Sequence, residues 1–163
     1  MTAVRAAFAK ACAREGFRLV HFAVMSNHVH YIVEADDARS LARGMQGLSI
    51  RVARGVNRVA GRVGRVFADR YHAEALPTPR QVRHALRYVL LNRQRHNGGI
   101  RVRFVGGEVD PCSSGAVFDG WARAVSFEER AGPETTAPAG TWLLRVGWRR
   151  HGAIDPREVP GPR

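Results

Sequence analysis

The chain has almost no lysine: Lys10 is a lysine, and the other 25 of its 26 Lys and Arg residues are arginine. Acidic residues are also scarce, since 14 Asp and Glu leave a formal net charge of +12. The planar arginine guanidinium suits phosphate oxygens and stacks on bases. A chain this basic attracts polyanions, and nucleic acid is the usual one. Composition alone does not separate that prediction from a codon bias toward arginine.

Cysteines and long apolar runs are scarce as well. Cys12 and Cys112 form neither a C-x-x-C pair nor a disulfide framework. No apolar run approaches the roughly 18–20 residues of a membrane span. The N-terminus has no apolar segment typical of a signal peptide. We therefore expect a cytoplasmic protein in a reducing compartment, without a structural zinc site built on paired cysteines.

The charge is concentrated in the first part of the chain. Residues 1–97 carry 17 basic and 6 acidic side chains, whereas residues 98–163 carry 9 and 8. Beyond residue 98, Gly, Pro and Ser are frequent and periodicity is weak, and residues 128–140 read as a linker. The apolar stretch 141–148 is expected to dock on the rest of the protein. These patterns predict a polyanion-binding domain at 1–97 and an irregular, partly linker-like C-terminal extension at 98–163.

Hydrophobic periodicity predicts alternating helices and strands in the first part. The expected helices cover residues 2–14, 37–60 and 79–96, and the expected strands cover 17–25, 28–34 and 66–76. This order predicts an α+β, ferredoxin-like (RRM-like) antiparallel sheet with helices on one face. Such a sheet has a strand before the first helix, and that strand is missing here. Either the start is truncated, or another segment fills that edge of the sheet.

Two histidines stand at a spacing that suits metal binding. Side chains at i and i+2 of a strand point to the same face, so His28 and His30 are expected side by side. Val29, Tyr31 and Val33 point to the other, apolar face. An isolated H-x-H also describes two ordinary surface histidines, so the pattern needs a second feature.

The second feature is the polar stripe of the helix expected at 79–96. Residues four apart lie one above the other on a helix, so Tyr88 and Asn92 are neighbours on the stripe that also holds Arg80, His84 and His96. An amide oxygen is a suitable ligand for Mg²⁺ or Mn²⁺. A tyrosine there is either a nucleophile or a boundary residue with a packed ring.

These two motifs resemble a known family. The stretch from Met25 to His30, followed by Glu34, is similar to the HUH motif of the REP-associated tyrosine transposases and other single-tyrosine HUH transposases. The stretch from Tyr88 to Asn92 is similar to the tyrosine helix of that family, and residues 65–76 also read like it. The resemblance covers about residues 5–97.

The resemblance implies a metal-dependent enzyme that cuts and rejoins single-stranded or hairpin DNA through a 5′-phosphotyrosine. His28, His30 and Asn92 would bind Mg²⁺ or Mn²⁺, and Tyr88 would be the nucleophile. The resemblance leaves the oligomeric state open, so both a monomer and a homodimer are possible interpretations. Because of the missing strand, an alternative also stays open, in which the protein is domesticated and binds such DNA without cutting it.

Nine arginines are predicted to bind the DNA backbone, some along the second helix and some nearer Tyr88. These are Arg39, Arg43, Arg51, Arg54, Arg58, Arg70, Arg80, Arg83 and Arg87. Tyr71 is the competing nucleophile, whereas strand parity places Tyr31 opposite the histidines. The tail tryptophans, Trp121, Trp142 and Trp148, either stack on bases or pack a small core.

Overall fold

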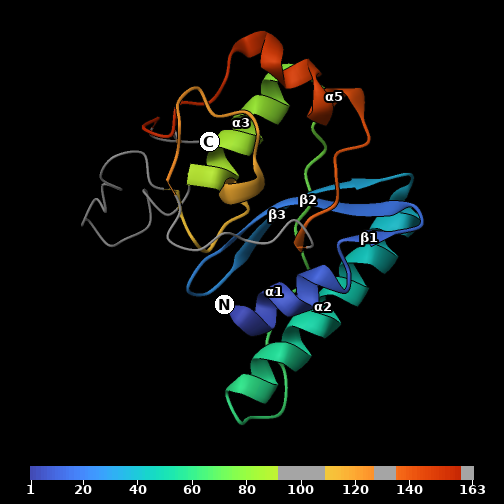
Figure 1. Cartoon of the computed structure of the whole chain (residues 1–163). Helices are drawn as coiled ribbons and strands as arrows, with labels where there is room; N and C mark the ends of the chain where they lie inside the picture. Colours follow the sequence, from blue (N-terminus) through green and yellow to red (C-terminus); the bar gives the residue numbers. More distant parts are fainter. Residues whose placement is uncertain (92–108, 127–134, 159–163) are drawn as a thin grey trace.

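A computed structural model describes residues 1–91, 109–126 and 135–158 of the chain (Figure 1). In the element order that follows, η1 and η3 denote 3₁₀ helices of the C-terminal extension. The elements are α1 (Thr2–Ala9), β1 (Ala13–Arg14), β2 (Phe17–Val24), β3 (Val29–Ala35), α2 (Ala38–Val59), α3 (Pro79–Leu91), η1 (Gly115–Val117), α5 (Trp142–Arg145) and η3 (Gly147–His151). None of the helices within these ranges has the length and apolar character needed to cross a membrane.

The sheet is built on the predicted hairpin of β2 and β3. The two strands pair antiparallel, and the backbone N–H of Met25 donates to the carbonyl of His28 at 2.9 Å. The turn between them is therefore centred on Ser26–Asn27, between the strands expected at 17–25 and 28–34. The short strand β1 pairs with β2 on its other side, which gives the order β1-β2-β3.

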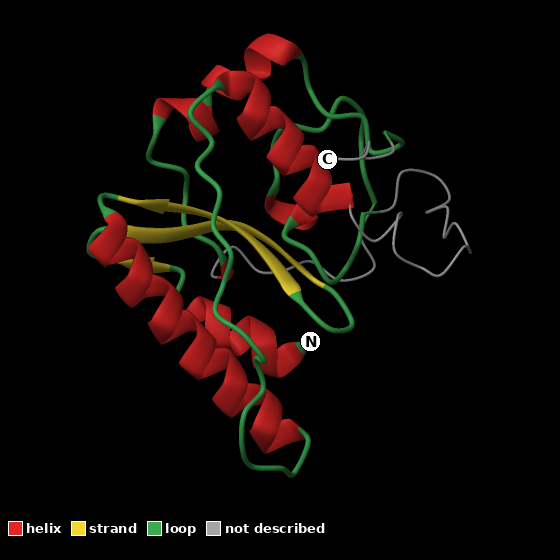
Figure 2. Cartoon of the chain, turned by 180° about the vertical axis from the view of Figure 1, so that it is seen from behind, coloured by secondary structure: helices red, strands yellow, loops and turns green. Residues whose placement is uncertain are grey.

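Helices cover both faces of this sheet (Figures 1 and 2). On one face, Phe8 of α1 and Leu48 of α2 pack against Phe22 of β2. On the other face, Leu86 of α3 packs against Ile32 of β3. The predicted α+β class and antiparallel sheet are confirmed, but the helices do not all lie on one face. Five consecutive residues of β2, Leu19 to Ala23, are buried. Because successive side chains of a strand point to opposite faces, both faces of β2 are packed against other elements.

The two long helices begin where their capping residues predict. The Asp37 side chain accepts a hydrogen bond from the Ser40 amide at 2.6 Å, and the Thr78 hydroxyl accepts one from the Gln81 amide at 3.3 Å. Pro79 is the first residue of α3. The strand predicted at 66–76 is wrong, since residues 61–78 form neither a strand nor a helix.

Segments of the C-terminal extension occupy the edge of β2 that does not face β3. The Val24 amide donates to the Cys112 carbonyl at 2.9 Å, and the Ser114 amide donates to the Phe22 carbonyl at 2.9 Å. Further along, the Ala137 amide donates to the Leu19 carbonyl at 2.8 Å. Segments of the extension thus fill this edge of β2, and the two expectations for the missing strand both stay open. The proposed division at residue 97 stays a prediction.

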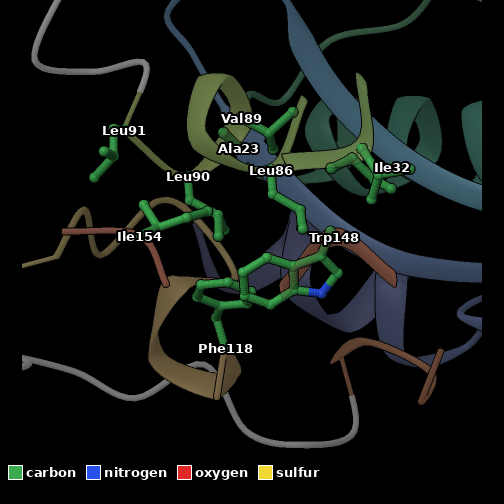
Figure 3. Packing of buried hydrophobic residues seen from close by; sticks show 10 residues of the cluster. Ala23, Ile32, Leu86, Val89, Leu90, Leu91, Phe118, Trp148 and Ile154 are labelled. Atoms are coloured by element: carbon green, nitrogen blue, oxygen red, sulfur yellow. The ribbon is translucent and has the colours of Figure 1, made fainter. Parts of the chain in front are cut away.

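The extension also supplies part of the core under α3 (Figure 3). Trp148 is 1% exposed and lies with Phe118 and Ile154 against Leu86 and Leu90 of α3. The indole N–H of Trp148 donates to the Leu144 carbonyl at 3.0 Å, so its polar atom is satisfied. Trp148 is therefore a core residue, and α3 is held between the sheet and the extension.

A buried histidine joins the extension to β2. His21 lies edge-on to Phe118, and its Nδ1 is 3.1 Å from the Ser114 hydroxyl. Burial lowers the pKa of His21 to about 4, and the charge of Asp119 opposes this shift only partly.

Stability should therefore depend on pH through His21. The unfolded chain binds a proton at this residue below about pH 6.5, whereas the folded chain does so only near its pKa of about 4. The free energy of unfolding should fall by up to about 3 kcal/mol as the pH decreases from 6.5 to 4. Urea unfolding of the wild type, His21→Gln and the exposed-histidine control His72→Gln checks this. Equal pH slopes in all three proteins would contradict it.

Candidate active site

His28 and His30 lie side by side at one end of the hairpin. His28 is in the turn directly before β3 and His30 is the second residue of that strand. Their Nε2 atoms are 3.0 Å apart and their ring centroids 4.6 Å apart. The predicted pairing of these two imidazoles on one face is therefore present in the structure.

The neighbour of His28 favours the ring form that binds metals. His28 Nδ1 lies 2.7 Å from the Asn27 side-chain oxygen, which can only accept a hydrogen bond. With the proton of its neutral ring on Nδ1, His28 donates to this oxygen and keeps a lone pair on Nε2. Metal-binding histidines usually donate their other ring N–H to an oxygen in this way.

Tyr88 of α3 completes this cluster. Its ring centroid is 5.0 Å from that of His30, and the two rings meet edge-on at 75°. The ring is partly buried against the core that contains Leu86 and Trp148. Hydrophobic packing of α3 on the sheet thus brings a tyrosine and a histidine pair together from positions far apart in the sequence.

The Nε2 atoms of His28 and His30 are within hydrogen-bond distance of each other, and the same separation is compatible with two ligands of one divalent ion. Two nitrogens that bind one ion at about 2.1 Å each, roughly at a right angle, are about 3.0 Å apart, which agrees with the observed Nε2 separation of 3.0 Å. The described ranges contain no group of three His, Cys, Asp or Glu residues around a common point. Asn92, the predicted third ligand, lies outside the described residues.

The other two tyrosines lie elsewhere. Tyr31 projects to the opposite face of β3, where its ring meets Phe8 edge-on at 5.8 Å. Burial raises the pKa of the Tyr31 hydroxyl, which makes the phenolate harder to form there. Tyr71 is 43% exposed in the irregular segment between α2 and α3. Of the three tyrosines, Tyr88 contacts the histidine pair.

Glu34, which is at the far end of β3, binds the extension. Its carboxylate accepts hydrogen bonds from the amides of Gly140 and Thr141 at 2.6 and 2.8 Å. It also accepts one from the Thr141 hydroxyl at 2.6 Å. In the sequence, Glu34 is notable only for following the stretch that resembles the HUH motif. Its role as an anchor could not be seen, since its partners are over a hundred positions away.

The arginines of α2 belong to the helix on the face of the sheet opposite α3. Arg39, Arg43, Arg54 and Arg58 are exposed, and Arg51 is half-buried with a hydrogen bond of 3.0 Å to the Gly47 carbonyl. Helix α2, which carries these arginines, covers the face of the sheet opposite α3 and Tyr88 (Figure 1). Their predicted contact with DNA stays a prediction.

Two arginines of α3 hold the extension. Arg83 donates to the carbonyls of Gly152 and Ala153 at 2.9 and 3.0 Å and to the Glu158 carboxylate at 2.8 Å. Arg87 lies 3.5 Å from the same carboxylate. Burial acts to raise the pKa of Glu158, but the hydrogen bonds from Arg83 and the Asp155 amide outweigh it and lower that pKa. Arg70 and Arg80 are exposed.

The first part of the chain matches a known protein family. The family model described as "Transposase IS200 like" matches residues 1–90. No curated protein and no solved structure gives a significant match to the chain. The matched region contains the hairpin with His28 and His30 and the turn of α3 with Tyr88. The chain belongs to the IS200-like transposases, the single-tyrosine HUH family.

Proposed function

We propose that this transposase is a metal-dependent nuclease that cuts and rejoins single-stranded or hairpin DNA through a covalent bond to Tyr88. The observation that carries the proposal is the meeting of three side chains at one place. The Nε2 atoms of His28 and His30 are 3.0 Å apart, and the Tyr88 ring lies 5.0 Å from the His30 ring. A histidine pair with a tyrosine beside it suits phosphoryl transfer to a phenol oxygen.

The reaction is a transesterification. The Tyr88 oxygen attacks the scissile phosphorus, and a bond forms between them as the bond from phosphorus to the 3′ oxygen breaks. The phenol loses one proton, and the departing 3′ oxygen gains one. The products are a 5′-phosphotyrosine and a free 3′-hydroxyl. Attack by a 3′-hydroxyl on the phosphotyrosine reverses the step, so rejoining needs no ATP.

His28 and His30 would hold Mg²⁺ or Mn²⁺, and Asn92 is proposed as the third ligand. A divalent ion would supply positive charge for the oxygens of the scissile phosphate. Because imidazole and amide ligands are neutral, they leave that charge undiminished. Asn27 keeps His28 in the required tautomer, and the Tyr88 ring contact keeps His30 in place.

A denaturing gel tests the requirement for the histidines and for metal. Purified protein is incubated with Mg²⁺ or Mn²⁺ and with labelled single-stranded oligonucleotides. The oligonucleotides have the sequences of the DNA that flanks the gene. We expect a covalent protein–DNA adduct with the wild type and its loss in EDTA. The variants His28→Ala and His30→Ala should each reduce the adduct at least about 100-fold, because one ligand of the pair is gone.

The matched control is His72→Gln, an exposed histidine outside the cluster. It should form the adduct as the wild type does. An adduct that persists in EDTA and in both alanine variants would overturn the metal-dependent mechanism. Binding of the oligonucleotides without any adduct would instead favour the domesticated, non-cutting protein.

A further inference from the structure

We infer that the C-terminal extension carries a binding surface for single-stranded DNA, with Trp142 and Arg150 as a stacking platform. The inference rests on the proposed function for its substrate class. The platform lies outside the region matched by the family model, which ends at residue 90. It would hold the strand beside the site, whereas the histidines and Tyr88 perform the chemistry.

Trp142 is the exposed tryptophan of the described extension. It is 49% exposed, whereas Trp148 is 1% exposed. The ring rests against Gly147, where an added Cβ would lie 2.6 Å from a ring carbon. The Arg150 guanidinium lies 4.8 Å from the ring centroid. Two planar groups are thus held together at the surface, and a base can stack on either kind of plane.

The surroundings of the platform are positively charged. Residues 141–151 contain Arg145, Arg149, Arg150 and His151 and no acidic residue. Arg149 is paired with Asp119 at 2.6 Å, but Arg145 and Arg150 form no ion pair with any residue that the structure describes. Their charge is therefore available to phosphates, and the nearby indole adds the stacking surface that distinguishes a strand with unpaired bases.

The platform and Tyr88 are both positioned by α3. Helix α3 contacts both α5 and η3, which carry Trp142 and Arg150. Arg80 and His84 are exposed on the same stripe as Tyr88, about 12 and 6 Å along the helix from it. Burial, followed by the charges of Arg87, Arg80, Arg83 and His151, lowers the pKa of His84. A phosphate chain that leaves Tyr88 along this stripe passes through positive potential until it reaches the platform.

Binding assays without chemistry test this inference. Every protein carries Tyr88→Phe, and binding is measured in EDTA by fluorescence anisotropy, so neither metal nor adduct contributes. The probes are labelled dT20 and an abasic oligomer with the same number of phosphates. Trp142→Ala should weaken binding to dT20 about tenfold and to the abasic oligomer less than twofold. Trp142→Phe should retain most of the affinity, because a phenyl ring still stacks.

Arg150→Ala provides a second test that does not depend on the indole. It should weaken both probes and reduce the slope of log affinity against log salt by about 0.7. Lys10→Ala, which removes one exposed charge at the end of α1, and Val146→Ala, which truncates an exposed side chain near the platform, should change affinity less than twofold.

Equal loss on both probes in Trp142→Ala, or no loss on either, would overturn the platform. The platform would also be overturned if a 20-base-pair duplex bound as tightly as dT20 and Trp142→Ala weakened binding of the duplex to the same extent. A platform that fails here while the wild type still forms its adduct leaves the nuclease proposal intact. A platform that binds as expected in a protein that forms no adduct refutes the nuclease alone.

Discussion

Tyr88→Phe should lower formation of the covalent adduct at least about a thousandfold, because it removes the attacking oxygen. The phenyl ring that remains keeps the edge contact with His30 and the packing against the core under α3. Binding of single-stranded DNA should therefore stay within about twofold of the wild type. Adduct yield on denaturing gels and anisotropy in EDTA measure the two quantities separately.

The other two tyrosines provide matched controls for this result. Tyr71→Phe tests the exposed competitor, and Tyr31→Phe tests the buried tyrosine on the opposite face. Both variants should form the adduct at the wild-type level. If Tyr88→Phe retained the adduct and Tyr71→Phe lost it, the segment between α2 and α3 would supply the nucleophile, and the site described above would be wrong.

Trp148→Ala should lower the free energy of unfolding by about 3–5 kcal/mol, the usual cost of truncating a fully buried tryptophan. The side chain is 1% exposed, lies 5.4 Å from the Phe118 ring and donates a hydrogen bond to the Leu144 carbonyl. Its loss leaves a cavity between α3 and the extension (Figure 3). Urea unfolding monitored by circular dichroism measures the change.

Trp142→Ala is the matched control for stability, because Trp142 is in the same segment but 49% exposed. We expect it to change the free energy of unfolding by less than about 1 kcal/mol. An equally small effect of Trp148→Ala would mean that the extension does not pack on α3 as described. A large effect would show that the tail is part of the folded unit that supports Tyr88.

The hairpin and the two long helices could be predicted from the sequence because their signals are local. The apolar stripe of α2 and its cap at Asp37 belong to one segment, as do the Thr78 cap and Pro79 of α3. The pairing of His28 with His30 follows from the alternation of side chains along a strand. Local periodicity thus placed both parts of the candidate site on their elements.

The role of the extension could not be predicted, because its contacts are made by single residues across long separations. Phe118, Trp148 and Ile154 are isolated apolar residues with no common period, and each becomes core only once α3 is beside it. Arg83 looks like the other arginines in the sequence, and its partner Glu158 is 75 positions away.

Two further expectations depended on knowing which edges and faces are occupied. The strand predicted at 66–76 contains suitable residues, but it pairs with no strand, and the edge of β2 is occupied by residues 112–114 and 137 and by β1. Helices were expected on one face of the sheet, yet Ala23 and Ile32 are buried against α3 on the other. The apolar character of β2 on both faces carried this information.

We propose that Tyr88, beside His28 and His30, forms the covalent bond to DNA. Mass spectrometry of the protease-digested adduct tests it most directly, since the peptides that contain Tyr31, Tyr71 and Tyr88 differ in mass. We expect a 5′-phosphorylated nucleotide on the peptide that contains Tyr88. A nucleotide on the Tyr71 peptide, or on a residue other than tyrosine, would contradict it.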